Sequence, residues 1–344
     1  MHLEKLSWLD RLLPVWILLA MAFGLVLGRL VPGMQVLLGS AELGNMSLPI
    51  ALGLMMMMYP VLAKVRYGEL GYVARDRSLL TTSLLLVWGL GPLLMFCLAW
   101  LFLPDQAEFR TGLIMIGIAP CIAMVLIWID LAKGDREVAA LLVAINSIVQ
   151  VLAYALLGNF YLKILPNFLG LDAQSINFSF SEIAKAVIIF LGIPLVAGFF
   201  TRRIGVAFKG IKWYEQRFIP RIAPWALYGL LFTIVIMFSL QGQAIISNPF
   251  QVAQVALPLL IYFVVMWGVA FFVGKNSGFS YEKTSALAFT AAGNNFELAI
   301  AVSISVWGVS SKQALAGVIG PLIEVPVLVA LVYLCLLLRP NFKK

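Results

Sequence analysis

The chain has 344 residues, of which 62% are hydrophobic and only 12% are charged, and its mean hydropathy is +1.00. Soluble domains carry roughly 25% charged residues, so this composition excludes an ordinary soluble protein and indicates a polytopic membrane protein. The formal net charge of +8 does not predict nucleic-acid binding, because the excess Lys and Arg lie beside predicted membrane spans.

The N-terminal segment Met1–Arg11 is short and mixed in charge, and a full spanning segment follows it, so no cleavable signal pattern is predicted. The single histidine is His2, which excludes a histidine-based metal site and a histidine-dependent catalytic triad. Cys97, Cys121 and Cys335 all lie inside apolar segments, so no disulfide framework is predicted. We expect no cofactor.

A membrane span needs about 20 mostly apolar residues. Ten segments meet this requirement: Leu12–Leu30, Met46–Ala63, Leu79–Leu103, Thr111–Ile129, Val138–Leu162, Ile183–Thr201, Ile222–Leu240, Phe250–Gly274, Thr284–Gly308 and Gln313–Leu338. The uncharged stretch Ile222–Gly274 is counted as two spans, because QGQAIISNP at 241–249 predicts a turn at its centre. The fold class is therefore an all-α polytopic membrane protein with ten transmembrane helices.

Lys and Arg set the orientation of the spans, because they concentrate on the cytoplasmic side. With the N-terminus in the cytoplasm, 19 of the 24 Lys and Arg fall on that side. We therefore expect a multi-pass protein of the cell membrane with both termini cytoplasmic.

An internal repeat relates the two halves of what we expect to be a single membrane transporter domain, 1–344. Pro49-Ile50-Ala51-Leu52 matches Pro224-Trp225-Ala226-Leu227 at an offset of 175 residues. The repeats cover about 12–162 and 183–338. Because each contains five spans, an odd number, they must have opposite orientations in the membrane. Inverted repeats are common in secondary transporters, where the substrate site lies between the halves.

Two spans carry helix-breaking residues at equivalent depths. Span nine contains Gly293, Asn294 and Asn295, which are poor helix formers. Span four contains Pro120, which lacks a backbone donor. Interrupted helices in corresponding positions of two repeats are the best sequence indication of a transporter site, so we predict helix breaks at Pro120 and Gly293.

Two carboxylates and one thiol lie near mid-depth in these spans. A charged side chain inside a bilayer is costly and usually functional, so Glu297 in span nine and Glu324 in span ten are predicted site residues. Cys121 follows Pro120 directly. A buried cysteine is most often a small packing residue, but the position of Cys121 at the break favours a role in the site.

Span five contributes two amides on one helical face, Asn146 and Gln150, which are four residues apart. They are equally compatible with hydrogen bonding between helices and with a role in the site. We include Asn146 among the predicted substrate-binding residues, with Asn294 and Asn295.

Four segments resemble the signatures of a known family: GIAPCIAMVLIW around Cys121, AINSIVQ at 144–150, GNNFELAIAV at 293–302 and VIGPLIEVPVL at 318–328. They are similar to the Acr-type arsenite efflux permeases, which belong to the larger group that includes the bile acid/sodium symporters. The resemblance covers essentially the whole chain. It implies a carrier with ten spans in two inverted repeats that exports arsenite, and sometimes antimonite, in exchange for protons.

In that family the cysteine of span four and the glutamate of span nine are held to matter, and here these are Cys121 and Glu297. The resemblance therefore implies binding of arsenic(III) at Cys121 and proton coupling at Glu297, with Glu324 as the other candidate for the proton. Ile122 departs from the family pattern, which often has Thr at this position, and leaves one fewer hydroxyl near the site.

Arsenite chemistry fits these residues. Near neutral pH arsenite is chiefly an uncharged trihydroxide, whose soft arsenic prefers sulfur and whose hydroxyls suit amides and carboxylates. Binding by one thiol with oxygen and nitrogen partners permits release, whereas three thiols would hold arsenic tightly.

Three alternatives stay open at this point. A sodium-coupled symporter of an organic anion on the same scaffold would use Asn294, Asn295 and the two glutamates as sodium ligands. An intramembrane enzyme and a channel are less consistent with the residue content and the repeat. The expected partners are arsenite, protons and the lipid bilayer, with no nucleic acid and no obligatory protein partner.

Overall fold

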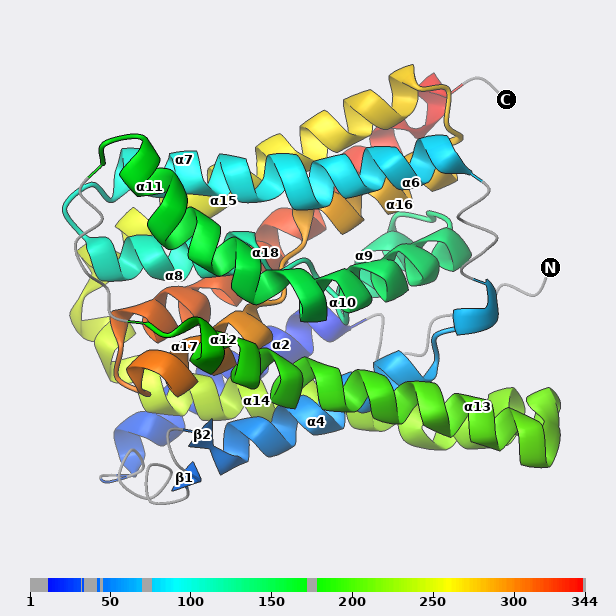
Figure 1. The fold of residues 1–344 in the computed structure, drawn as a ribbon, viewed down its shortest axis with the longest axis horizontal. Coiled ribbons are helices and arrows are strands. Elements are labelled where there is room, and N and C mark those ends of the chain that lie inside the picture. Colours follow the sequence, from blue (N-terminus) through cyan, green and yellow to red (C-terminus); the bar gives the residue numbers. More distant parts are fainter. Residues whose placement is uncertain are drawn as a thin grey trace.

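The computed structural model describes residues 12–31, 33, 42–43, 46–69, 76–171 and 178–342. His2, Lys343 and Lys344 lie outside this set. The described chain is helical almost throughout (Figure 1). A short antiparallel pair, β1 (Glu42–Leu43) and β2 (Met46–Ser47), precedes α4. The α-helices are α2 (Leu13–Leu30), α4 (Leu48–Ala63), α6 (Arg77–Leu84), α7 (Gly91–Phe102), α8 (Ala107–Gly117), α9 (Val125–Leu131), α10 (Arg136–Asn159), α11 (Leu165–Phe168), α12 (Phe180–Val187), α13 (Ile193–Trp213), α14 (Ile219–Ser247), α15 (Pro249–Asn276), α16 (Tyr281–Ala292), α17 (Phe296–Trp307) and α18 (Lys312–Leu338). Two 3₁₀ turns, η1 (Tyr67–Glu69) and η6 (Arg339–Asn341), follow α4 and α18.

Several of these helices are long and apolar enough to cross a membrane. Within the described part of the chain the long stretches are Arg77–Phe102, Arg136–Phe168, Phe180–Ser247, Pro249–Asn276 and Lys312–Asn341. Shorter apolar helices cover Pro14–Leu30, Leu48–Ala63 and Phe296–Trp307. The prediction of an almost entirely helical chain with several helices apolar enough to cross a membrane is therefore confirmed for the described residues.

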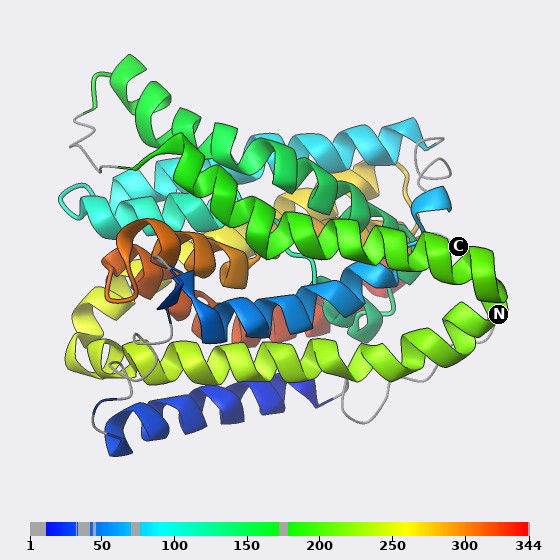
Figure 2. The ribbon, with the colours of Figure 1, turned by 60° about the horizontal axis from the view of Figure 1, so that its bottom comes forward.

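The stretch Phe180–Ser247 is longer than the predicted spans within it, because the helix continues through a basic segment that we read as a loop. The turn comes at Gly210, whose φ of 79° and ψ of 159° are outside the helical region. Glycine adopts a positive φ without steric cost. Beyond it the chain turns back through η5 (Tyr214–Phe218), which packs on α13, and continues as α14, with α4 between α13 and α14 (Figure 2).

Four π-helical turns interrupt the long helices, and each is followed by a proline two residues after its last residue. They are η2 (Leu85–Leu90) before Pro92, η3 (Phe160–Ile164) before Pro166, η4 (Ile188–Gly192) before Pro194 and η5 (Tyr214–Phe218) before Pro220. A proline ring clashes with the carbonyl four residues earlier and supplies no donor to it. Widening the preceding turn to a π-helix accommodates that clash, so these helices continue across their prolines.

The helices form two groups. The first group, which we call the outer layer, contains α2, α4, α13 and α14, with α14 packed on both α2 and α4 (Figure 2). Glycines allow the backbones to touch. A Cβ added at Gly229 of α14 would lie 2.6 Å from the Met57 nitrogen of α4, and one at Gly24 would lie 2.7 Å from the Phe238 Cβ. Close contact through small residues is typical of helix packing in membranes.

The second group, which we call the bundle, contains α6–α7, α8–α9, α10, α15, α16–α17 and α18 (Figure 1). α15 packs on α16, α18 and α7, and α18 packs on α8 and α17. α12 packs on α10 and α17 of the bundle and continues through η4 (Ile188–Gly192) into α13 of the outer layer. The predicted spans Thr111–Ile129 and Thr284–Gly308 each consist of two short helices inside this bundle.

Candidate functional site

The first interruption lies between α8 and α9. α8 ends at Gly117 and α9 begins only at Val125. Pro120 lies in the non-helical segment between them, where its missing N–H cannot continue the helical hydrogen-bond ladder. Ala119 still donates its N–H to the Ile116 carbonyl at 3.0 Å, so the chain leaves the helix through one tightened turn.

The second interruption lies between α16 and α17. Gly293 is extended, with φ −76° and ψ 144°, and ends α16. Asn295 is the N-cap of α17, and its Oδ1 accepts a hydrogen bond from the Leu298 N–H at 3.1 Å. A capping side chain satisfies a donor that has no partner within the helix. The Gly-Asn-Asn segment thus ends one helix and starts the next.

The two interruptions cross and bond to each other. The Cys121 N–H donates to the Gly293 carbonyl at 3.0 Å, and the Asn295 N–H donates to the Ala119 carbonyl at 2.7 Å. This is a single antiparallel bridge between two broken helices. Non-helical backbone inside a membrane must form hydrogen bonds within the protein. Here each interruption supplies hydrogen-bond partners for the other. The bridge fixes the positions of the flanking side chains.

The Asn294 side chain locks the crossing further. Asn294 lies opposite Pro120 in the bridge, and its Nδ2 donates to the Ile116 carbonyl at the end of α8 at 2.9 Å. An amide side chain from span nine therefore satisfies a backbone acceptor of span four. Its Oδ1 has no hydrogen-bond partner among the described residues.

Cys121 and Glu324 flank the backbone of Gly293. A Cβ built on Gly293 would lie 3.0 Å from the Cys121 Cβ and 3.6 Å from Glu324 Oε1. Both side chains therefore lie close to the space that a side chain at Gly293 would occupy. Both are buried, with 3% and 0% of their surfaces exposed.

The carboxyl group of Glu324 is unusual for a buried acid. The Asn294 backbone amide faces it, yet neither carboxyl oxygen completes a hydrogen bond within the described residues. Glu297 interacts electrostatically with both Glu324 and Cys121. It lies in the first turn of α17, where the helix dipole favours a negative charge. Two acids and one thiol thus meet at the crossing.

Several buried polar atoms without a described partner lie on the residues around this point. Among the described residues they include Thr290 Oγ1, Asn294 Oδ1, Asn295 Nδ2 and both oxygens of Glu324. An unpaired buried polar atom costs roughly 1–3 kcal/mol. Several of them together indicate a place where a polar molecule binds.

The two predicted amides of α10, Asn146 and Gln150, form no described hydrogen bond with the crossing. Asn146 Oδ1 accepts a hydrogen bond from Trp88 Nε1 of η2 at 3.1 Å, and its Nδ2 is unpaired within the described chain. The amide atoms of Gln150 are both buried without a described partner. Asn146 is therefore hydrogen-bonded to Trp88, and none of its described hydrogen bonds reaches the crossing.

Sequence reasoning missed two residues. Tyr262 of α15 is 2% exposed and interacts with Asn294 and Glu324. Trp88 is the partner of Asn146. Both are aromatic residues within apolar spans, where aromatic side chains usually pack, so no pattern in the sequence distinguished them.

The other two cysteines lie away from the crossing. Cys97 is exposed on α7, and Cys335 is buried near the end of α18. Cys335 Sγ lies 3.2 Å from the Ser285 hydroxyl and 3.4 Å from the Tyr281 hydroxyl. Of the three thiols, Cys121 is the one that lies beside the two glutamates.

Comparison with known proteins finds relatives over nearly the full length of the chain. Residues 51–248 match the model of the Sodium Bile acid symporter family. The "Arsenical-resistance protein Acr3" of Corynebacterium glutamicum is 58% identical over 337 residues, which cover 98% of this chain and 91% of that protein.

Two further relatives are more distant. The "Uncharacterized transporter slr0944" of Synechocystis is 32% identical over 96% of this chain and 89% of its own length. The "Arsenical-resistance protein Acr3" of Alkaliphilus metalliredigens is 29% identical over 96% of this chain and 92% of its own length.

Proposed function

Because this chain belongs to the Sodium Bile acid symporter family and, within it, to the Acr-type arsenical-resistance permeases, we propose that it exports trivalent arsenic from the cytoplasm in exchange for protons. It is a transporter rather than an enzyme, as its family implies. The observation that carries the proposal is the crossing of two broken helices, where Cys121 and the Glu324 carboxyl group both lie next to the position that a Gly293 side chain would occupy.

The chemistry at Cys121 follows from the substrate. Arsenite arrives as the neutral trihydroxide, and the sulfur displaces one hydroxyl to form an arsenic–sulfur bond. The displaced hydroxyl leaves as water with the proton of the thiol, so the step is balanced and changes no net charge. We assign the transfer of that proton to Glu297 and Glu324. A single arsenic–sulfur bond reverses readily, which transport requires.

The remaining hydroxyls of bound arsenite need hydrogen-bond partners. Asn294 Oδ1 and Asn295 Nδ2 are buried and unpaired within the described residues, and the carboxyl oxygens of Glu324 are equally unpaired. We assign these groups to the substrate. Antimonite has the same trihydroxide form and would use the same partners. Asn146 joins the set only if the helices move, because it is bonded to Trp88 here.

Proton coupling rests on the two glutamates. Both carboxyl groups are buried, and each can bind a proton and release it. We assign the transported proton to Glu297, and arsenite occupancy opposes proton occupancy. Because the arsenite is neutral, inward movement of one proton transfers one positive charge, which a potential negative inside favours by about 2.3 kcal/mol per 100 mV.

The helix bounds support ten spans in two inverted repeats. Shifted by 175 residues, α8 (107–117) covers 282–292, beside α16 (281–292), and α9 (125–131) falls within α17. The same shift places α10 on α18, α6–α7 on α15 and α4 within α14. The bridge between the breaks is antiparallel, as two segments related by a twofold axis in the membrane plane would be.

Alternating access follows from the two groups of helices. The outer layer contacts the bundle through α18, which packs on α14 and α2, and through α17, which packs on α4 and β2. Gln241 Nε2 of α14 also donates to the Val309 carbonyl after α17 at 2.7 Å. The half-helices α9 and α16 pack mainly within the bundle. We propose that the site is sealed on the α17 side and opens towards α9 and α16, with both termini on that cytoplasmic side of the cell membrane.

Arsenite uptake by everted membrane vesicles from cells that express the protein tests this function. A gradient with protons concentrated inside should drive accumulation of arsenite, and a protonophore should stop it. A sodium gradient should have no effect. Accumulation that follows sodium and ignores the protonophore would identify a sodium-coupled symporter instead, and no arsenite uptake under either gradient would refute the proposal.

A further inference from the structure

The turn between α13 and α14 forms a basic and aromatic helical hairpin. Residues 200–221, which we call the basic hairpin, contain six Lys or Arg and a single acid, Glu215. The basic hairpin reaches further than the neighbouring helices at this end of the molecule (Figures 1 and 2). Its position and charge play no part in the arsenite site.

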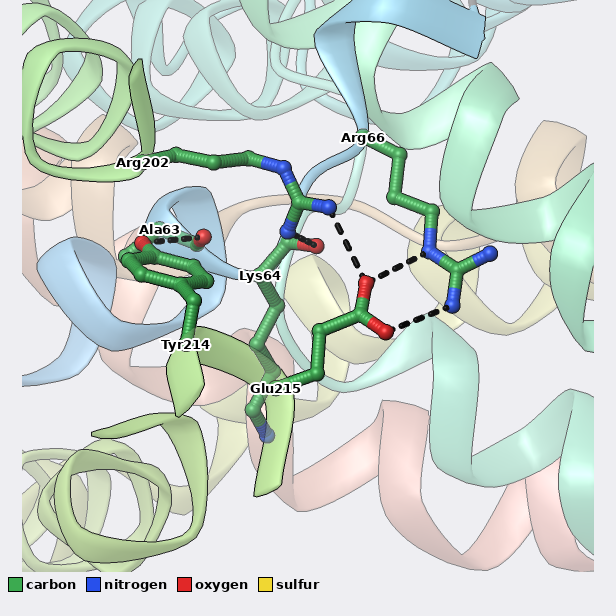
Figure 3. A network of polar contacts seen from close by, with 6 residues as sticks. All are labelled: Ala63, Lys64, Arg66, Arg202, Tyr214 and Glu215. Carbon is green, nitrogen blue, oxygen red and sulfur yellow. Dashed lines mark hydrogen bonds and ion pairs between the residues drawn. The ribbon is translucent and has the colours of Figure 1, made fainter. Parts of the chain in front are cut away.

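The one acid of the basic hairpin is already neutralised. Glu215 Oε1 lies 3.1 Å from Arg202 Nη2 and 3.2 Å from Arg66 Nε (Figure 3). The adjacent Tyr214 donates its hydroxyl to the Ala63 carbonyl at 2.9 Å, which ties the hairpin to the end of α4 (Figure 3). The other five cations have exposed side chains: Arg203, Lys209, Lys212, Arg217 and Arg221. The hairpin therefore presents a net positive surface on a fixed backbone.

An apolar groove runs along the same hairpin. It has a volume of about 410 Å³ and is lined by Phe200, Ile204, Trp213 and Phe218 among others. That volume lies within the range of roughly 300–1,000 Å³ found for small-molecule sites. Lys209 Nζ lies 4.5 Å from the centre of the Trp213 ring, so a cation sits directly on a wall of the groove.

Apolar side chains remain exposed up to the tip of the hairpin. Phe208 is 85% exposed, Ile204 52% and Ile211 51%. A surface that combines large apolar residues with Lys and Arg is typical of segments at the boundary between acyl chains and headgroups. The positive charges of this surface favour an anionic group, and the apolar groove favours a hydrocarbon chain.

We propose that the basic hairpin binds an acidic phospholipid of the adjacent leaflet. One acyl chain lies in the groove against Trp213. The anionic headgroup is held by Lys209, Lys212 and Arg217, which flank Trp213 along the chain. Basic residues beside apolar helix surfaces recognise anionic lipids through the same combination of forces.

Quenching of tryptophan fluorescence by brominated lipid tests this site. The protein is placed in nanodiscs that contain increasing fractions of phosphatidylglycerol or phosphatidylcholine with brominated acyl chains. The signal from the groove is the difference between the wild-type protein and Trp213→Phe. A triple variant, Lys209→Gln/Lys212→Gln/Arg217→Gln, removes the proposed headgroup contacts. A matched control, Lys64→Gln/Lys133→Gln/Lys275→Gln, removes three exposed cations from the same predicted face.

The proposal predicts that phosphatidylglycerol quenches Trp213 at a lower fraction than phosphatidylcholine. The hairpin variant should need at least about 5-fold more phosphatidylglycerol for half-quenching, and the control variant should match the wild type. Added phosphatidylglycerol should also raise the melting temperature of the wild type and the control in detergent, but not that of the hairpin variant.

Equal quenching by the two lipids would overturn the proposal. An equal loss of the preference for phosphatidylglycerol in both triple variants would also overturn it, because that loss would reflect surface charge alone. Absence of quenching together with a dimer cross-linked through the hairpin would assign the groove to a second copy of the chain and would equally overturn the lipid site. None of these measurements depends on arsenite transport.

Discussion

Replacing Gly112 with alanine changes the contact between the two helices that carry the site. Gly112 lies in α8, where an added Cβ would be 2.7 Å from both the Ala316 Cβ and the Gln313 carbonyl oxygen of α18. Non-bonded carbon atoms are comfortable at about 3.5–4.0 Å, so α8 and α18 would have to separate by about 1 Å. Neither obstacle can move away by changing a rotamer, because one is a backbone oxygen and the other is the Cβ of an alanine.

The energetic cost can be worked from this geometry. Overpacking of a close interface costs about 1–3 kcal/mol, and alanine gains about 0.5–1 kcal/mol over glycine inside a helix. The net expectation for Gly112→Ala is a destabilisation of about 1–2 kcal/mol. Because α8 leads to Cys121 and α18 carries Glu324, the separation also widens the site, and arsenite transport should fall.

The control is the same substitution at Gly268 in α15, where an added Cβ meets nothing within 4 Å. Gly268→Ala should be neutral or stabilising by up to about 1 kcal/mol. Thermal unfolding in detergent should therefore shift in opposite directions for the two variants. Adding Ala316→Gly to Gly112→Ala removes one obstacle and should restore part of the loss. Unchanged stability and transport in Gly112→Ala would refute the close packing described here.

Three further predictions concern coupling, capping and topology. Glu297→Gln should keep arsenite binding but lose proton-driven accumulation in everted vesicles, because an amide cannot carry the proton; if Glu324→Gln alone has this effect, the proton carrier is Glu324. Asn295→Ala should cost about 1 kcal/mol by removing the cap of α17, whereas Asn295→Ser keeps a capping oxygen, and equal melting temperatures would contradict the capping role. Reporters that are active only in the cytoplasm, fused at Lys344 and after Ser247, should give opposite signals, and equal signals would mean that a span was miscounted.

The sequence indicated the apolar helices and the places where two of them are interrupted, because these depend on local properties. Composition marks the spans. Pro120 and Gly293 mark the interruptions, since a missing donor and a flexible backbone act on the chain where they stand.

The contact between the interruptions depends on tertiary structure and was beyond sequence reasoning. The bond from Asn294 to the Ile116 carbonyl joins residues 178 apart. Tyr262 reaches the site from another helix, and its aromatic ring gives no sign of that role in the sequence. Asn146 was included on its depth and polarity, but the π-turn that presents Trp88 to it could not be foreseen.

The predicted spans Ile183–Thr201 and Ile222–Leu240 leave the basic segment between them outside the membrane, because its charge marks a membrane boundary. Charge does not end a helix, however, and Lys and Arg are good helix formers. The helix therefore continues until Gly210, where a positive φ turns the chain.

The central claim is that Cys121, at the crossing, binds arsenic directly. A Cys97→Ser/Cys335→Ser protein, with Cys121 as its single thiol, should bind arsenite with one sulfur in the arsenic coordination shell, as measured by X-ray absorption at the arsenic edge, and should transport it at close to the wild-type rate. Cys121→Ser should show only oxygen around arsenic and lose transport. Full transport by Cys121→Ser, or an absence of sulfur coordination in the single-thiol protein, would contradict the account.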